Sequence, residues 1–226
     1  KVKSSGAHVG FVVDPDVDRL AIVCEDGSMF GEEYTLVSVA DYIMSRTPGN
    51  TVSNMSSTRA LRDITEAQGN TYTAAAVGEV NVVAAMKATQ AVIGGEGNGG
   101  IIYPELHYGR DALVGIALFL SALAEKACPV SSLRDSFPNY IISKNKIELT
   151  PDINVDLVLE GICKLYSHEK INTTDGVKID FSDSWVHLRK SNTEPIIRIY
   201  AEANDAIKAT AISQKIISEI RQICSR

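Results

Sequence analysis

The feature that most constrains the fold is a repeated alternation of short apolar runs with amphipathic stretches between residues 28 and 135. In the amphipathic stretches apolar residues recur at helical spacing, whereas the short runs have the length and composition of buried strands. The expected strands are residues 51–55, 71–77 and 91–103, the last interrupted by a glycine-rich loop, and the expected helices are residues 32–46, 58–69, 79–89 and 109–127. Such an alternation is typical of an α/β fold, with a parallel or mixed sheet covered by helices.

A different pattern follows residues 128–140, where two prolines and several serines indicate a domain boundary or linker. The elements expected beyond it are strands at residues 140–149, 177–181, 185–189 and 196–203, one helix after Pro151 and a closing helix at 205–223. Consecutive strands with helices to one side are typical of an α+β fold with an antiparallel sheet. The sequence therefore predicts two domains of different class, residues 28–135 and residues 140–226.

Charge and composition argue against several classes of function. The 226 residues carry a formal net charge of −6 and no long basic run, which argues against a nucleic-acid surface and an anionic-membrane surface. The longest nearly apolar stretch, residues 112–124, is too short to span a bilayer, and no signal peptide is recognised. The cysteines lie far apart without metal-binding spacing, which favours a reduced, cytoplasmic protein. They are Cys24, Cys128, Cys163 and Cys224.

The first loop with chemical potential is VDPDVDR, residues 13–19, in which Asp14, Asp16 and Asp18 precede Arg19. In a straight strand these aspartates would stand roughly 6.5–7 Å apart per step. Because Mg²⁺ ligand oxygens lie only about 2.1 Å from the metal, the segment must curl if it is to bind one. Hard carboxylate oxygens favour Mg²⁺ or Ca²⁺, and a cation would relieve their mutual repulsion. A solvated acidic turn is the alternative.

An EF-hand is the obvious competitor for this aspartate spacing, since Glu25 stands at the twelfth position of such a loop. The sixth position is Arg19, where the turn requires glycine, and the flanking segments 9–13 and 20–24 are expected to be strands and not helices. We therefore reject the EF-hand interpretation.

The second loop is GGEGNGG, residues 94–100, where five glycines allow a close approach of the backbone to a ligand. Its only side chains, Glu96 and Asn98, suit the hydroxyl groups of a polar ligand. The loop matches neither dinucleotide nor P-loop motifs, and Glu96 would repel a phosphate. A plain turn is the alternative.

The third loop is RKSNTEP, residues 189–195, which lies between two expected strands. Its arginine can fork onto phosphate oxygens, and its hydroxyl and amide groups together with a tight backbone turn can bind an anion. The candidate ligands of a phosphate group are Arg189, Ser191, Asn192 and Thr193, with Lys190 and Arg198 adding positive charge. A polar hairpin turn is the alternative.

In this order the loops resemble those of the α-D-phosphohexomutase superfamily, which includes phosphoglucosamine mutases, phosphomannomutases and phosphoglucomutases. DPDVDR resembles the family's Mg²⁺ loop D-x-D-x-D-R, GGEGNGG its sugar loop G-E-x-S-G, and RKSNTEP its phosphate loop R-x-S-[GN]-T-E-P. The resemblance covers essentially the whole chain. It implies that residues 1–27 are the end of family domain 2, residues 28–135 are domain 3, and residues 140–226 are a TATA-binding-protein-like domain 4.

The resemblance also implies a reaction, the interconversion of hexose 1-phosphates and 6-phosphates through a phosphoserine. In that scheme the three aspartates hold Mg²⁺, and Arg19 neutralises charge on the transferring phosphoryl group. Glu96 and Asn98 contact sugar hydroxyls. The phosphate-loop residues Arg189, Ser191, Asn192 and Thr193 hold the phosphate that does not react.

Two departures from the family pattern limit the implied function. Asn98 replaces the usual serine, and Gly100 stands where many members have histidine. No segment matches the T-A-S-H-N-P-type loop that carries the family's phosphoserine, so we expect a fragment that is inactive alone and binds metal weakly. The alternative is a non-catalytic sugar-phosphate-binding protein, and a Mg²⁺-dependent phosphatase is a weaker third option. The sugar and the oligomeric state stay open.

Overall fold

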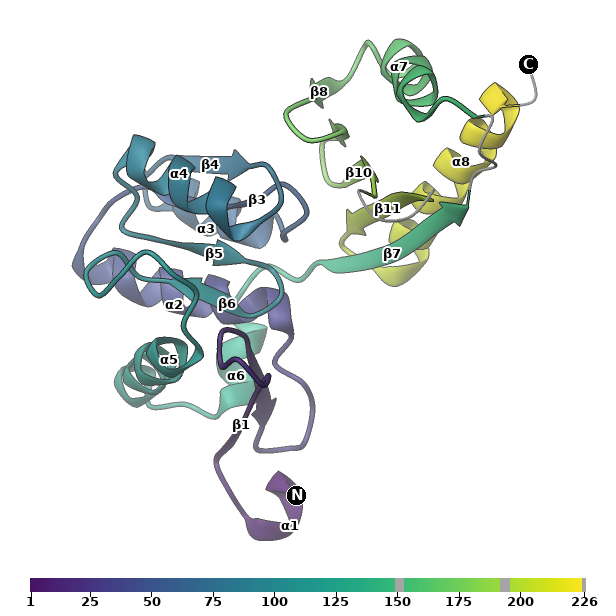
Figure 1. Ribbon diagram of the computed structural model, residues 1–226. Helices are drawn as coiled ribbons and strands as arrows, with labels where there is room; N and C mark the ends of the chain where they lie inside the picture. Colours follow the sequence, from purple (N-terminus) through teal and green to yellow (C-terminus); the bar gives the residue numbers. More distant parts are fainter. Residues whose placement is uncertain (149–152, 192–195, 225–226) are drawn as a thin grey trace. The chain divides into compact units, whose positions relative to one another are not determined.

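The computed structural model describes residues 1–148, 153–191 and 196–224, which form two compact units, Lys1–Asn139 and Tyr140–Arg226 (Figure 1). Among the residues described, no helix combines the length and the apolar character needed to cross a membrane.

The N-terminal unit contains a mixed four-stranded sheet in the order β4-β3-β5-β6, in which only β6 runs antiparallel to its neighbour. Its elements are α1 (Val2–Ser5), β1 (Val9–Val13), β2 (Leu20–Cys24), α2 (Glu32–Arg46), β3 (Thr51–Asn54), α3 (Ala60–Ala67), β4 (Tyr72–Ala75), α4 (Glu79–Thr89), β5 (Ile93–Glu96), β6 (Gly100–Ile102), α5 (Ala112–Lys126) and α6 (Val130–Asp135). Helix α4 packs on β3 and β5, while α2 packs against α3 and α5. This layered α/β arrangement confirms the fold class predicted for the first domain.

Strands β1 and β2 form a separate antiparallel hairpin in the same unit. The hairpin is fixed by aromatic packing, because the ring of Phe11 in β1 meets Phe119 of α5 edge-on with 6.1 Å between centroids. Phe30 contacts the other side of Phe119 at 5.1 Å, also edge-on. Burial of these rings holds the loop between the two strands against the rest of the unit.

The C-terminal unit is a five-stranded antiparallel sheet in the order β7-β11-β10-β9-β8. Its elements are β7 (Ile141–Glu148), α7 (Val155–Leu165), β8 (Lys170–Asn172), β9 (Val177–Asp180), β10 (Trp185–Lys190), β11 (Ile196–Ala203) and α8 (Ala206–Cys224). One sheet face carries alternating Ile, Val and Leu side chains that pack with α7 and α8 into a single core. The predicted antiparallel α+β class is confirmed.

Several local predictions need correction. The stretch 128–140, expected to be a domain boundary or linker, includes the boundary between the two units but is not a plain linker, because it contains helix α6, whose Val130 and Leu133 are buried. Strand β8 was not anticipated. Asn192 and Thr193 lie outside the described residues. The assignment of residues 1–27 to a preceding domain stays a prediction, and in the structure they belong to the same compact unit as α2–α6.

Candidate active site

The aspartate loop joins β1 to β2 and is curled, with Val17 in the left-handed region at φ 58°. Each of the three carboxylates offers an oxygen, and these oxygens all lie within 4.8 Å of one another. Asp14 Oδ1 holds the curl by accepting hydrogen bonds from the backbone N–H groups of Asp18 and Arg19, both at 3.1 Å. The loop is therefore not extended, and its curl brings the three carboxylates together, as a metal-binding loop requires.

The cluster fits a small divalent cation. Ligand oxygens on opposite sides of one Mg²⁺ lie about 4.2 Å apart, so this spacing needs only small side-chain rotations. Asp18 Oδ1 is buried without a hydrogen-bond partner among the described residues, and Arg19 Nε lies 3.6 Å from it. A buried carboxylate oxygen that accepts no hydrogen bond is costly unless a cation faces it.

Ionisation within the cluster is uneven. Burial raises the pKa of Asp18 above its usual range, and the carboxylates of Asp14 and Asp16 add to the rise, although the Arg110 guanidinium opposes it. For Asp14, desolvation is outweighed by backbone hydrogen bonds from Arg19 and Asp18 and by contact with the Asp18 side chain, so its pKa is lowered. Asp14 is thus the more acidic of the two.

The EF-hand alternative is excluded by the elements on either side of the loop, which are strands β1 and β2. Glu25, the residue at the twelfth position, points to α6 instead of the aspartates. Its carboxylate accepts hydrogen bonds from the backbone N–H of Ser131 at 3.1 Å and from the Ser131 hydroxyl. These bonds lower the pKa of Glu25, chiefly through the hydroxyl.

The glycine-rich loop is the end of β5 and its tight turn into β6, and it lies directly against the aspartate loop. The backbone N–H of Leu20, the first residue after Arg19, donates to the carbonyl of Gly99 at 3.1 Å. Gly99 has φ 86°, and a Cβ there would lie 2.2 Å from the Leu20 carbonyl oxygen. Glycine is therefore needed at this position for the two loops to meet.

Glu96 is almost completely buried at the end of β5, with 4% of its surface exposed. Its Oε1 accepts hydrogen bonds from the Asn54 side-chain amide at 2.8 Å and the Gly78 backbone N–H at 3.2 Å. Its Oε2 accepts from Arg110 Nη1 at 2.7 Å. Asn98 is partly exposed, and its Oδ1 accepts from the Gly100 backbone N–H at 3.2 Å.

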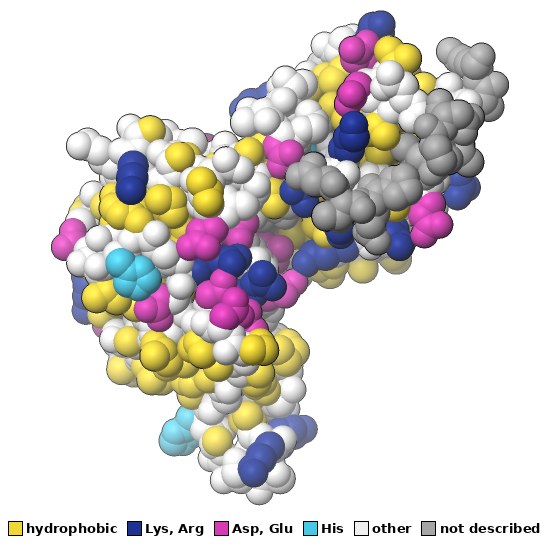
Figure 2. All heavy atoms as spheres, in the orientation of Figure 1, with side chains coloured by type: hydrophobic (Ala, Val, Ile, Leu, Met, Phe, Trp, Pro, Cys, Tyr) yellow, Lys and Arg dark blue, Asp and Glu magenta, His cyan; other side chains and the backbone are white. Residues whose placement is uncertain are grey.

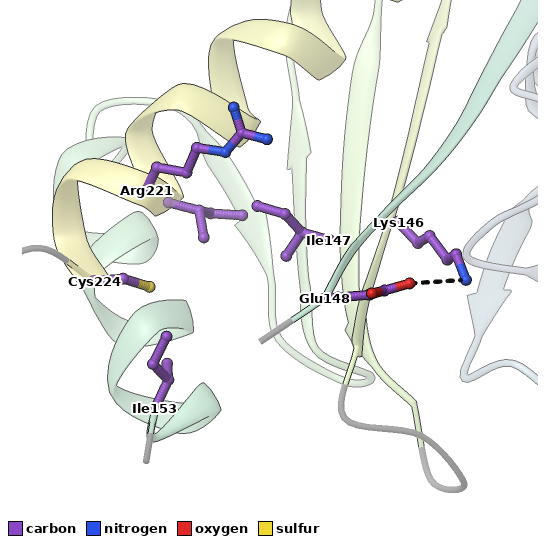
Figure 3. A pocket seen from close by; sticks show the side chains of 7 residues that line it. Lys146, Ile147, Glu148, Ile153, Arg221 and Cys224 are labelled. Carbon is purple, nitrogen blue, oxygen red and sulfur yellow. Dashed lines mark ion pairs between the residues drawn. The ribbon is translucent and has the colours of Figure 1, made fainter. Parts of the chain in front are cut away.

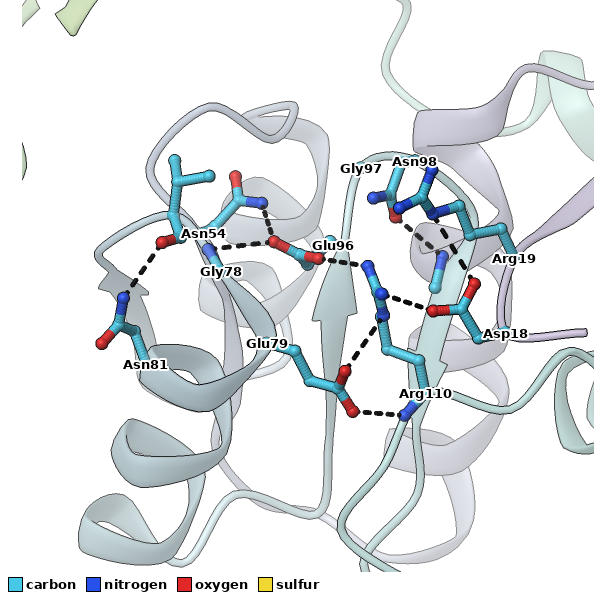
Figure 4. A network of polar contacts seen from close by, with 12 residues as sticks. Asp18, Arg19, Asn54, Gly78, Glu79, Asn81, Glu96, Gly97, Asn98 and Arg110 are labelled. Carbon is cyan, nitrogen blue, oxygen red and sulfur yellow. Dashed lines mark hydrogen bonds and ion pairs between the residues drawn. The ribbon is translucent and has the colours of Figure 1, made fainter. Parts of the chain in front are cut away.

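Arg110, which sequence reasoning did not single out, ties these loops together (Figure 4). Its guanidinium forms ion pairs with Asp18 of the aspartate loop, with Glu96 at 2.7 Å and with Glu79 of α4 at 3.4 Å. The residue lies just before Asp111, the N-cap of α5. An arginine directly before the N-cap of the most apolar helix was the signal available in the sequence. Figure 2 shows the acidic and basic side chains gathered on this face of the unit.

The third loop belongs to the C-terminal unit, where Arg189 is the second-last residue of β10 and has its side chain 27% exposed. Arg189 is paired in register with Arg198 of β11, which is in turn paired with Lys146 of β7. Like charges directly opposite each other destabilise a sheet unless an anion or counter-charge relieves them. Ser191 is 8% exposed, and its backbone N–H donates to Ile196 at 3.0 Å, which closes the described part of the loop.

A cavity of about 550 Å³ in the same unit contains none of the predicted site residues (Figure 3). Its lining is Lys146, Ile147, Glu148, Ile153, Ile220, Arg221 and Cys224. Figure 3 shows Lys146 directed toward Glu148, with which it forms an ion pair at 3.4 Å. This cavity therefore does not coincide with the loops predicted from the sequence.

Comparison with models of protein families shows which family this chain belongs to. The model for phosphoglucomutase/phosphomannomutase alpha/beta/alpha domain III matches residues 31–140, and the model for the C-terminal domain of the same enzymes matches residues 144–219. The chain belongs to the phosphoglucomutase/phosphomannomutase family. The resemblance predicted from the loops is thereby confirmed, and the two family domains match the observed α/β and α+β folds.

Family relatives extend the comparison. A probable phosphoglucosamine mutase of Methanopyrus kandleri is 29% identical over 223 residues, which is 98% of this chain and 49% of the relative. A phosphoglucomutase/phosphomannomutase of Thermococcus kodakarensis is 35% identical over 92% of this chain and 46% of its own length. The chain thus spans about half the length of the curated relatives it matches.

Solved structures of the family share the fold. A Burkholderia thailandensis phosphoglucomutase/phosphomannomutase family protein superposes with a TM-score of 0.80 at 24% identity, covering 98% of this chain and 48% of that one. Aspergillus fumigatus N-acetylphosphoglucosamine mutase, in complex with GlcNAc-6P and magnesium, gives a TM-score of 0.67 at 15% identity, covering 93% and 51%.

Proposed function

We propose that this chain is the metal-, sugar- and phosphate-binding part of a Mg²⁺-dependent phosphohexomutase of the phosphoglucosamine or phosphomannose type. The whole protein would interconvert hexose 1-phosphates and 6-phosphates, using a phosphoserine supplied by a segment outside this chain. Support comes from the phosphoglucosamine mutase and phosphomannomutase relatives, each about twice as long as the chain. A cytoplasmic location remains a prediction from the four free cysteines.

One observation carries the proposal: the aspartate loop and the glycine loop meet in one site. They are joined by the backbone bond from Leu20 to Gly99, at 3.1 Å, and by Arg110, which pairs with both Asp18 and Glu96. A metal held by the first loop and a sugar held by the second would therefore be neighbours. Phosphoryl transfer depends on that kind of positioning more than on covalent chemistry by the protein.

The roles of the residues follow from their surroundings. Asp14, Asp16 and Asp18 would hold Mg²⁺, which when bound offsets negative charge on the phosphoryl group and orients it. Arg19, with its side chain 51% exposed, can turn to a phosphoryl oxygen. These groups stabilise charge that is spread over the oxygens during transfer between serine and sugar.

Substrate orientation would depend on the other two loops. Glu96 is held rigidly by three hydrogen bonds and can accept one more from a sugar hydroxyl, and the partly exposed Asn98 can donate or accept. Arg189, Ser191, Asn192 and Thr193 would bind the phosphate that does not react, by charge-assisted hydrogen bonds. A substrate with equivalent contacts in two orientations can then present either of its phosphates for transfer.

The test is a substrate panel on the longer protein that carries this chain. We expect conversion of glucosamine, mannose or glucose 6-phosphate to the 1-phosphate, dependent on Mg²⁺. Absence of conversion with all three sugars would contradict the mutase. Hexose-phosphate binding without turnover by that protein would instead favour the alternative, a sugar-phosphate-binding protein without catalysis.

A further inference from the structure

We infer that Arg110 is a positioning residue that couples the aspartate loop to the glycine loop, so that a divalent cation and a hexose phosphate strengthen each other's binding. The inference rests on the proposed function and adds a residue to it. One guanidinium is paired with Asp18 in the first loop and Glu96 in the second. A change in position of either carboxylate is therefore transmitted to the other through a single rigid, planar group.

Arg110 is held firmly enough to transmit such a change. Its side chain is only 13% exposed, and Glu79 holds both ends of the residue. Glu79 Oε1 accepts from the Arg110 backbone N–H at 2.9 Å, and Glu79 Oε2 lies 3.4 Å from Arg110 Nε. The guanidinium fork then presents its two terminal nitrogens to the two loops, a geometry that lysine, with one ammonium group, cannot reproduce.

The contacts also assign a separate task to each carboxylate oxygen. Asp18 uses Oδ2 for Arg110, which leaves Oδ1, buried and without a hydrogen bond, 3.6 Å from Arg19 Nε. Glu96 uses Oε2 for Arg110 and keeps Oε1 for Asn54 and Gly78. Arg110 thus fixes the direction in which Asp18 faces a cation and the direction in which Glu96 faces a sugar.

The glycine loop is shaped around this arginine. A Cβ at residue 100 would lie 2.5 Å from Arg110 Cδ and 3.2 Å from its Cγ, so the aliphatic stem of Arg110 occupies the space that a side chain there would need. This accounts for Gly100 at the position where the family resemblance leads one to expect histidine. The absence of a side chain at Gly100 is thus what allows Arg110 to take this position.

The experiment measures linkage between two ligands on the full chain. Mn²⁺ affinity is determined by electron paramagnetic resonance, with and without saturating glucosamine, mannose or glucose 6-phosphate. Coupled sites typically change each other's affinity 5- to 150-fold, so we expect at least about a 5-fold tightening of Mn²⁺ by the sugar phosphate that binds. Reciprocity requires the same factor when the sugar phosphate is titrated with and without Mn²⁺.

Variants then test whether Arg110 carries the coupling. Arg110→Ala should bind each ligand with a coupling factor near 1, and Arg110→Lys should recover only a small part of the factor. Gly100→Ala displaces the arginine stem while keeping the charge, and should also lower the coupling factor. It provides the test if Arg110→Ala fails to fold.

Arg134→Ala is the matched control, because it removes another packed arginine, which lies over Tyr34 and donates a hydrogen bond to the Phe30 carbonyl. It should lower thermal stability and leave the factor unchanged.

The outcomes separate this inference from the proposed function. Wild-type affinities for both ligands that are independent of each other would overturn the coupling and leave the sites intact. A factor that persists in Arg110→Ala, or returns fully in Arg110→Lys, would show that the fork is not the link. Failure of the wild-type chain to bind Mn²⁺ at millimolar concentration would overturn the metal site, and the inference with it.

Discussion

The aspartate loop of the N-terminal unit and the strands around Arg189 in the C-terminal unit each gather like charges, acidic in the first and basic in the second. In the N-terminal unit the carboxylates of Asp18, Glu79 and Glu96 surround one guanidinium, that of Arg110. In the C-terminal unit Arg189 and Arg198 face each other across two strands. The nearest acid to Arg189 that the structure pairs with it, Asp175, is 3.9 Å away. The acidic site is largely neutralised from within by Arg110. In the basic row, by which we mean Arg189, Arg198 and Lys146, like charges stand directly opposite one another across the strands.

The difference indicates what each region lacks. The acidic site leaves Asp18 Oδ1 without a hydrogen bond and gathers three carboxylates within 4.8 Å of one another, an arrangement that a small cation fits. The basic row has cationic side chains in register along three strands, an arrangement that fits an anion with several oxygens.

The largest expected effect is on the acidic side of the comparison. Asp16→Asn should lower Mg²⁺-dependent turnover by the longer protein about 1,000-fold, the upper range for removing one group that stabilises transition-state charge. The fold should be unaffected, because Asp16 is exposed. Steady-state kinetics check the rate and circular dichroism the fold. Glu66→Gln, an exposed acid on α3, is the control and should change neither. Retained activity in Asp16→Asn would contradict the metal-loop assignment.

A pH effect on stability is expected in the core of the C-terminal unit. His187 of β10 is 2% exposed, and burial, together with Lys178 and Arg189, lowers its pKa to about 4, although its contact with the Asp175 carbonyl opposes the shift. The unfolded chain, with an ordinary pKa of about 6.5, binds the proton more readily than the folded unit. Stability is therefore complete above pH 6.5 and is lost as the pH falls toward 4, by up to about 3 kcal/mol.

Fluorescence can follow this loss in one unit alone, because Trp185 is the single tryptophan and is fully buried beside Glu202. Urea unfolding monitored at this residue should give a midpoint that falls between pH 6.5 and pH 4. His187→Gln removes the titrating group and should flatten that part of the profile. An unchanged slope in the variant would assign the pH dependence to other groups of the unit.

A somewhat smaller effect is expected at the basic row. Arg189→Ala removes a charge-assisted fork worth about 1.5–3 kcal/mol, so the affinity for a hexose phosphate should fall about 10- to 150-fold. Calorimetry on the longer protein measures it. Lys190→Ala, at a side chain 55% exposed, is the matched control and should cost less than about 1 kcal/mol. Equal losses in both variants would mean that general charge, and not the arginine fork, holds the phosphate.

Much of the fold could be predicted because its signals are local. The helix predicted at residues 32–46 and the strand predicted at residues 196–203 coincide with α2 and β11, since both are continuous periodic patterns with clear ends. Helix α6 was missed because Pro129 and the serines after it resemble a linker. Proline and serine are also common at the start of a helix, and only the burial of Val130 and Leu133 decides between the two.

The candidate site was predictable only in part, for a different reason. The three aspartates and Glu96 stand in short motifs that can be recognised alone. Arg110 acquires its place only when α4, the β1–β2 loop and the end of β5 come together around it, and no local pattern records those contacts. The sequence likewise places Arg189 and Arg198 in neighbouring strands, but their pairing depends on the register.

The smallest expected effect is the difference in stability between two glycine-to-alanine variants of the N-terminal unit, which separates the cost of close packing from that of backbone conformation. Gly99 and Gly69 both have left-handed φ values, 86° and 75°. A Cβ at Gly69 would meet nothing within 4 Å, whereas one at Gly99 would lie 2.2 Å from the Leu20 carbonyl oxygen. Alanine should therefore cost about 1–2 kcal/mol at residue 69, from conformation alone, and more at residue 99.

The excess at residue 99 measures how tightly the two acidic-site loops are joined. Thermal unfolding of Gly99→Ala and Gly69→Ala gives the difference in stability, which we expect to exceed about 1 kcal/mol because the backbone of Leu20 must shift. That shift would also displace the neighbouring Arg19 and Asp18, so Gly99→Ala, unlike Gly69→Ala, should weaken Mn²⁺ binding. Equal stability and equal Mn²⁺ affinity in the two variants would mean that the loops move independently, and that contact between them does not set the geometry of the metal cluster.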